Sequence, residues 1–319
     1  LIPNFFGMTN HLGEGYFGFS YAVPDSIIEN QDSRFTNLTG ISDYLVNVDI
    51  YDNTTLIGAS YATALSDTLN FGVTLYLHTR EKKLTTNQWI QRTDNRFEWS
   101  NVYNENEETG YLPILGLLWS PDDTMSVGLT LRKTFIKTSK TSIQRTCVSD
   151  LNLVGQAAEC QTVVGFQTGP AFLESPAKRR FPTQLTLGLA YFPTNKLLYS
   201  ADLNYYEAVS DPFFDKEAIL NIAFGVEYYV SKTWILRGGV FTNNANTPDI
   251  KVTEVNQPEH TDLRGVSVSL SQFTKSSSFT VGFVSASGSG QSQVVAGVTE
   301  IQDQEQESIT LYLSSSTKF

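Results

Sequence analysis

The sequence contains no long hydrophobic run. Its longest candidates, such as Leu112–Trp119, fall far short of the roughly 20 apolar residues that a transmembrane helix needs. Basic residues are also scarce, because 22 Lys and Arg stand against 33 Asp and Glu, which gives a formal net charge of −11. This acidic balance argues against a nucleic-acid partner, which needs a basic face, and against a basic helix lying on anionic lipid.

Residues that commonly carry metal or catalytic chemistry are few. The three histidines, His11, His78 and His260, show no metal-ligand spacing, and no G-x-S-x-G or P-loop motif is present. We therefore predict that the chain is not an enzyme and uses no metal or other cofactor. The only cysteines, Cys147 and Cys160, lie in a segment rich in Thr, Ser and Gln. This pair predicts a disulfide in an oxidising compartment, with two free thiols as the alternative.

Apolar and polar residues alternate along much of the chain. Between Leu69 and Leu77 every odd position is apolar, while Asn, Gly, Thr and Tyr occupy the even positions. The same period of two recurs in Met125–Arg132, Leu220–Tyr228 and the closing run Ser308–Leu313. Since successive side chains of a strand point to opposite faces, this period predicts β-strands with one apolar face. No stretch has a convincing helical period, so we predict an all-β protein.

Three features favour a membrane barrel over a soluble β-sandwich. The apolar parity typically spans about nine residues, which matches the roughly 9–11 residues of a tilted strand crossing hydrocarbon. Tight connections alternate with long polar stretches, as in barrels with short periplasmic turns and long extracellular loops. Aromatic residues such as Trp119, Tyr229 and Trp234 flank the tight turns, as expected at a membrane interface. We therefore predict a closed antiparallel transmembrane β-barrel.

The expected number of strands is twelve to fourteen. With both termini on the periplasmic side, the twelve predicted strands are Gly15–Val23, Asp43–Leu65, Leu69–Thr79, Phe97–Trp119, Met125–Ile136, Thr183–Phe192, Leu197–Glu207, Ala218–Tyr229, Thr233–Thr242, Leu263–Phe273, Ser277–Ala286 and Ser308–Phe319. The second and fourth of these are longer than a membrane crossing, so they either project beyond the bilayer or break near Asn53 or Asn106. Polar stretches such as Arg80–Asn95, Lys137–Arg180 and Gly288–Glu307 are expected to be outer loops.

The end of the chain indicates where such a barrel would reside. Ile309, Leu311, Leu313 and the terminal Phe319 share one parity, so they point to one side of the last strand. An aromatic terminal residue on such a strand resembles the signal that bacterial outer-membrane barrels present to their insertion machinery. We predict a multi-pass protein of the outer membrane, with membrane lipids, lipopolysaccharide and that machinery, bound through Phe319, as partners.

Several hairpins resemble those of a known family. Each of these hairpins has a Gly-centred strand, a polar tight turn and a second strand: Leu56–Thr79, Leu185–Tyr206 and Asn221–Thr247. The second strand carries an Asp-x-x-Tyr pattern in Leu185–Tyr206 and an Arg-Gly-Gly pattern in Asn221–Thr247. In this form they are similar to outer-membrane hydrophobic-compound transporters, typified by the fatty-acid transporter FadL and the toluene transporters. The resemblance implies a fourteen-stranded barrel with an amino-terminal hatch, ligand capture among the outer loops and sideways release. Residues 1–14 would be a residual plug and residues 15–319 the barrel.

The strand parity also nominates interior residues. Arg132, Asp202, Glu227 and Arg237 are expected to face the lumen, where charges cost less than on the lipid side. The last three lie on consecutive strands, so an ion-pair network is expected there. It would fill and stiffen the lumen, or form a constriction.

Exposed aromatic residues of the outer loops are the candidates for ligand capture. They are Phe166, Phe172, Phe213 and Phe214, and packing within the loops is their alternative role. The leading hypothesis is passive transport of a small hydrophobic molecule, fatty-acid-like or an aromatic hydrocarbon, through a plugged barrel. The alternatives are an accessory or anchoring barrel that holds a protein partner through its extracellular loops, and a general diffusion porin.

Overall fold

The computed structural model describes residues 4–36, 38–149, 178–212, 214–255, 257–293 and 299–317, which form one antiparallel sheet of 15 strands. The strands are β1 Phe5–Leu12, β2 Gly15–Phe35, β3 Ile41–Ala64, β4 Leu69–Arg92, β5 Phe97–Asp122, β6 Met125–Arg132, β7 Phe135–Ser149, β8 Gln184–Thr194, β9 Leu197–Tyr206, β10 Ile219–Tyr229, β11 Trp234–Asn243, β12 His260–Thr261, β13 Leu263–Phe273, β14 Ser277–Ser292 and β15 Gln302–Thr317. No helix among these residues has the length and hydropathy needed to cross a bilayer.

Most strands pair with the next strand along the chain. Two departures come from interrupted strands: β6 and β7 both lie along β5, and β12 and β13 both lie along β14. β6 has β5 on one side and β8 on the other, whereas the one partner of β7 among the described residues is β5. The sheet therefore forks at Lys133 and Thr134, between β6 and β7. Opposite the fork, a Cβ on Gly110 would lie 2.1 Å from the carbonyl oxygen of Phe135. Glycine permits this close backbone approach.

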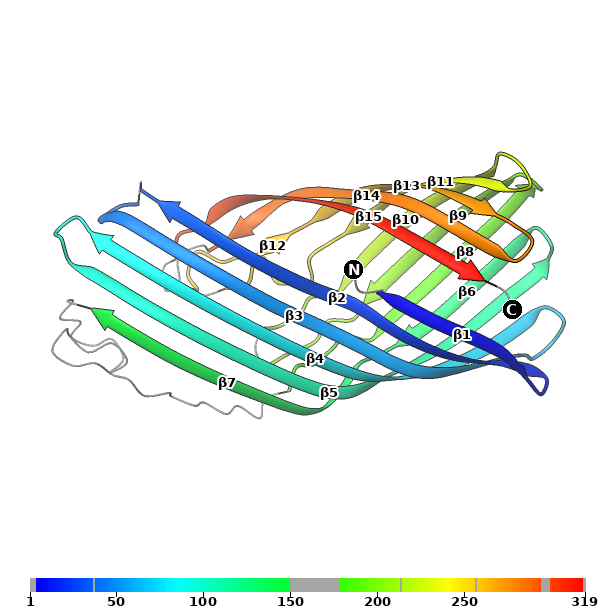
Figure 1. The fold of residues 1–319 in the computed structure, drawn as a ribbon, viewed down its shortest axis with the longest axis horizontal. Coiled ribbons are helices and arrows are strands. Elements are labelled where there is room, and N and C mark those ends of the chain that lie inside the picture. Colours follow the sequence, from blue (N-terminus) through cyan, green and yellow to red (C-terminus); the bar gives the residue numbers. More distant parts are fainter. Residues whose placement is uncertain are drawn as a thin grey trace.

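The sheet curls so that its first and last strands come to the same side (Figure 1). The hydrogen-bonded order ends at β1 in one direction and at β15 in the other. A cavity of 870 Å³ lies between them, lined by β1, by Tyr16, Phe17 and Phe19 of β2, and by Ser316 and Thr317 of β15. The two edge strands are therefore neighbours across this gap.

The apolar parity predicted from the sequence lies on the outer face. Leu75 and Leu77 of β4 are each 56% exposed, and Leu311 of β15 is 71% exposed. Equivalent residues of the other strands form a continuous apolar surface, which includes Leu115, Leu117, Leu129, Leu131, Leu185, Leu187, Leu189, Leu203, Phe224, Val226, Leu236, Val266, Val268, Leu270, Val281 and Phe283. An exposed apolar band of this extent is rare on soluble monomers and indicates contact with another apolar phase.

The predicted tight turns are confirmed, but several strands extend beyond their predicted ends. β4 runs on to Arg92 and β7 to Ser149, so the prediction of outer loops from Arg80 and from Lys137 onward was wrong for these residues. The strand Phe5–Leu12 was not predicted; it pairs with β2, within the segment assigned to a plug. In the extensions of β2–β5 both faces carry polar residues, so the alternation is lost. Cross-strand pairs such as Arg34 with Asp43 connect the strands there.

Candidate lumen and mouth

Glycines on four adjacent strands line the middle of the inner face. Gly72 of β4 stands opposite Gly116 of β5, and Gly128 of β6 stands opposite Gly188 of β8. The inward parity places them between Asn70 and Thr74 on β4 and between Thr130 and Ser126 on β6. We call these four glycines the glycine band.

The glycine band leaves open space. A Cβ on Gly128 would have no heavy atom within 4 Å, and a Cβ on Gly116 would first meet Thr130 at 3.6 Å. A cavity of 460 Å³ lies over the band, bounded also by Ala62, Leu118, Thr186 and Asp202. The missing side chains therefore create a compartment of the size and largely apolar lining that small-molecule sites commonly have.

A second cavity, of 280 Å³, continues around the inner face from β9 to β13. It is lined by Ser200, Asp202, Gly225, Glu227, Arg237, Gly239, Ser267, Ser269 and, from the last strand, Tyr312. Glu227 and Arg237 are cross-strand partners and form an ion pair, and Arg237 also hydrogen-bonds to Ser271. Asp202 lines both cavities and so stands at their junction.

Arg132 lies apart from these residues. It is the last residue of β6, and its Nε donates a hydrogen bond of 2.5 Å to Oε1 of Gln184 on β8. Gln184 also lies 3.4 Å from the side-chain oxygen of Asn204 on β9, and Asn204 accepts a bond from Thr186. This is a hydrogen-bonded row across three strands.

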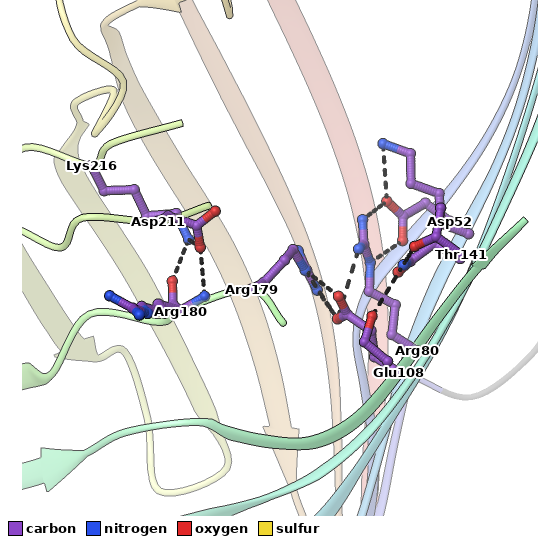
Figure 2. Close-up of polar contacts among 11 residues, drawn as sticks. Asp52, Arg80, Glu108, Thr141, Arg179, Arg180, Asp211 and Lys216 are labelled. Atoms are coloured by element: carbon purple, nitrogen blue, oxygen red, sulfur yellow. Dashed lines mark hydrogen bonds and ion pairs between the residues drawn. The ribbon is translucent and has the colours of Figure 1, made fainter. Parts of the chain in front are cut away.

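A cluster of buried charges lies on the inner face beyond this row, where β3, β4 and β5 continue past the fork (Figure 2). Arg80 of β4 donates two hydrogen bonds to Asp52 of β3, one of them 2.6 Å long from Nε to Oδ1. Glu108 of β5, whose side chain is fully buried, lies 3.9 Å from Arg80. Arg179 donates to both Glu108 carboxylate oxygens at 2.6–2.9 Å. We call these four residues the mouth cluster.

Arg179 belongs to a segment that crosses the inner space. Residues Lys178–Thr183, here called the crossing segment, precede β8. On one side Arg179 binds Glu108, and the Phe181 ring lies 5.9 Å from the ring of His78. On the other side Lys216, in the connection between β9 and β10, donates a bond of 2.7 Å to the carbonyl oxygen of Arg180. The segment thus ties one wall of the curled sheet to a loop from the opposite part, as Figure 2 shows.

The end of the crossing segment is held by a third charged contact. Lys133, at the fork, lies 2.6 Å from Glu207, which also accepts hydrogen bonds from the backbone N–H and the hydroxyl of Thr183. These three donors lower the pKa of the Glu207 carboxyl to about 2. The carboxylate therefore stays charged and bonded at any pH near neutrality.

The residues that the sequence nominated are only partly brought together. Asp202, Glu227 and Arg237 share one cavity, and two of them form the expected ion pair. Asp202 has no hydrogen-bond or ion-pair partner among the residues that the structure describes. The expected ion-pair network of three residues is therefore present there as the Glu227–Arg237 pair alone. Phe214 is 40% exposed, with the ammonium of Lys216 5.8 Å from its ring centre. The roles proposed for these residues stay predictions.

Other nominated positions lie outside the described residues. These are Phe166, Phe172, Phe213, Cys160 and Phe319; the side chain of Cys147 is likewise outside them. Within the described part of the chain, no group of His, Cys, Asp and Glu side chains is arranged to hold a metal ion.

The mouth cluster was missed by the sequence analysis, which placed Glu108 within the predicted strand Phe97–Trp119 and gave its side chain no partner. In the structure Glu108 is 1% exposed. The signal that would have found it is parity. Arg80 continues the inward positions Thr74, Tyr76 and His78 of β4, and Glu108 continues those of β5. Two opposite charges on one continued face predict a pair.

Comparison with known proteins rests on the fold alone. No protein-family model and no curated protein sequence matches the chain. Among solved structures, the toluene transporter TodX of P. putida matches with a TM-score of 0.65 and 16% identity, over 99% of this chain and 82% of TodX. A FadL homologue of Pseudomonas aeruginosa matches with a TM-score of 0.61 and 13% identity, over 98% and 76% of the two chains.

A third solved structure agrees with these two. The monoaromatic hydrocarbon channel CymD matches with a TM-score of 0.58 and 13% identity, over 99% of this chain and 82% of CymD. These proteins are described as transporters or channels, or as a FadL homologue, and none of the three as an enzyme, in agreement with the prediction of no enzymatic activity. The chain therefore has the fold of the FadL- and TodX-type hydrophobic-compound transporters, as its hairpins suggested.

Proposed function

We propose that the chain closes into a barrel in the bacterial outer membrane and lets small hydrophobic molecules cross by passive diffusion. The exposed apolar band supports a lipid-facing exterior, because it follows one strand parity around the sheet. The nearness of β1 and β15 across the gap supports closure. Contact with lipopolysaccharide, and with insertion machinery through Phe319, belongs to the same proposal.

The observation that carries the proposal is the glycine band with its cavity. A diffusion porin needs a polar, water-filled interior. The inward residues of this cavity are instead the four glycines, Ala62 and Leu118, together with the polar residues Asn70, Thr130, Thr186 and Asp202. Such a surface can hold an apolar molecule without desolvating many polar groups. The descriptions of TodX and CymD name toluene and monoaromatic hydrocarbons, which are molecules of a size suited to this space.

The crossing segment would restrict the mouth of this path. Its contacts with Glu108 on one side and Lys216 on the other hold it across the inner space. We propose that it does the work of a plug at this end, so that water and ions do not flow freely. The plug predicted for residues 1–14 stays a prediction.

The test is uptake by intact cells of a Gram-negative host. Cells expressing the chain should take up radiolabelled toluene several-fold faster than cells carrying an empty vector, and the purified protein should show little ion conductance in a planar bilayer. Large, steady ion conductance with no gain in toluene uptake would favour a porin and contradict the proposal. Unchanged uptake and conductance, with co-purification of a large partner, would favour the accessory role.

A further inference from the structure

We propose that Asp202 makes the lumen selective by charge, so that neutral and cationic hydrophobic molecules pass in preference to anionic ones. This inference rests on the proposed transport function and deepens it, because it names the class of substrate. It predicts an aromatic hydrocarbon or an aromatic amine as the substrate, and not a fatty-acid carboxylate.

The position of Asp202 is the first support. It lies on β9, between Gly188 on β8 and Ala223 on β10. A Cβ on Gly188 would lie 2.8 Å from Oδ1 of Asp202, so the glycine is what gives the carboxylate its room at the cavity wall. Because Asp202 borders both cavities, a molecule held in either of them lies beside this residue.

The balance of charge around the cavities is the second support. Asp202 is the one ionisable residue that lines the cavity over the glycine band. In the other cavity Glu227 and Arg237 neutralise each other through their ion pair. The lining residues of the two cavities together therefore carry one unbalanced negative charge, and it resides on Asp202.

An uncompensated charge at the wall of a partly apolar cavity acts on an ion inside that cavity. The effective dielectric beside a protein wall is lower than that of bulk water, so the charge acts more strongly there than it would in free solution. An anion is repelled and a cation attracted, each by an amount that corresponds to roughly tenfold or more in rate. A neutral hydrocarbon is little affected.

Three molecules with the same ring isolate the effect of charge: toluene, benzylammonium and benzoate. Their uptake is measured with wild-type protein and with Asp202→Asn, which keeps the size of the side chain and removes its charge. With the wild type, toluene and benzylammonium should enter at least about tenfold faster than benzoate. Asp202→Asn should raise benzoate uptake about tenfold and lower that of benzylammonium, each measured relative to the toluene uptake of the same variant.

Two further variants complete the design. Asp249→Asn is the matched control, because its side chain is 93% exposed outside the strands, and it should leave all three rates unchanged. Glu227→Gln removes the negative partner of Arg237, so the positive charge of Arg237 then offsets the negative charge of Asp202. This variant should therefore also raise benzoate uptake. It tests the charge filter independently if Asp202→Asn is poorly folded.

The outcomes separate this inference from the function on which it rests. If toluene enters while the ratio of toluene uptake to benzoate uptake is the same in the wild type, Asp202→Asn and Glu227→Gln, the proposed charge selectivity is wrong and the transport function stands. If the wild type admits none of the three molecules, both the transport function and the filter are overturned.

Discussion

The mouth and the middle of the lumen use opposite kinds of side chain. At the mouth, long charged residues such as Glu108 and Arg179 fill the interior, and their charges are paired at 2.6–2.9 Å. In the middle, glycines such as Gly116 and Gly128 leave the interior open, and Asp202 lacks a partner among the described residues. Under the proposed function, the same inward parity closes the path at one level and keeps it open at the other.

The contrast teaches where each region gets its stability. At the mouth the side chains themselves hold the crossing segment, so removing one partner leaves a buried charge. In the middle the backbone ladder holds the strands, and the side chains contribute little. Substitutions should therefore change stability at the mouth and passage in the middle.

The largest loss of stability is expected for Glu108→Gln. This change leaves Arg179 and Arg80 facing a neutral amide inside the fold, and breaking a buried pair typically costs about 3–5 kcal/mol. Amides of the crossing segment should lose protection from hydrogen exchange. The control is Glu105→Gln, whose partially exposed partner is Lys83; it should cost less than about 1 kcal/mol. Equal losses of unfolding free energy in Glu108→Gln and Glu105→Gln would contradict the view that the buried pair contributes more than the exposed one.

A smaller difference is expected between alanine at two glycines. Gly110→Ala places a Cβ against the Phe135 carbonyl at the fork, and overpacking of this kind costs about 1–3 kcal/mol. Gly128→Ala meets open space and should leave the free energy of unfolding nearly unchanged. Urea unfolding of both proteins in lipid vesicles measures the difference. Comparable destabilisation by both changes would mean that the middle is packed and not open.

The smallest effect concerns pH at the end of the crossing segment. The pKa of Glu207 is lowered to about 2 in the folded protein, from an ordinary value of 4.5. Its stabilising contribution is therefore fully present above about pH 4.5 and is lost as the pH falls toward 2. The protection factor of the Thr183 amide should stay constant from pH 8 to 5 and decline below that. Glu207→Gln should abolish this decline; a decline that persists would assign it to another group.

The fold was largely predictable from the sequence where one face of each strand is apolar. Leu69–Leu77 and Leu220–Tyr228 lie in strands as predicted, with their apolar residues outward. Beyond the fork, no single face of β4 or β7 must be apolar, so the alternation that marks a strand fades. These extensions were therefore mistaken for loops.

The candidate site was predictable only in part, for a related reason. Charged lumen residues such as Glu227 and Arg237 stand out against an apolar strand. Gly128 does not, because glycine at an inward position reads as a weak strand residue until its neighbours in the sheet are known. The glycine band exists through the register of four strands, and Glu108 meets Arg179 across 71 residues of sequence. Neither arrangement follows from local pattern.

The central claim is that the open space over the glycine band is the path. It is tested most directly by toluene uptake in a series at one position, Gly128→Ala, Gly128→Val and Gly128→Leu, with Val127→Leu on the opposite face as the control. The account predicts that uptake falls stepwise as the side chain grows, by about tenfold or more at leucine, while the amount of folded protein and the control stay at the wild-type level. Uptake that stays constant across the series would contradict it.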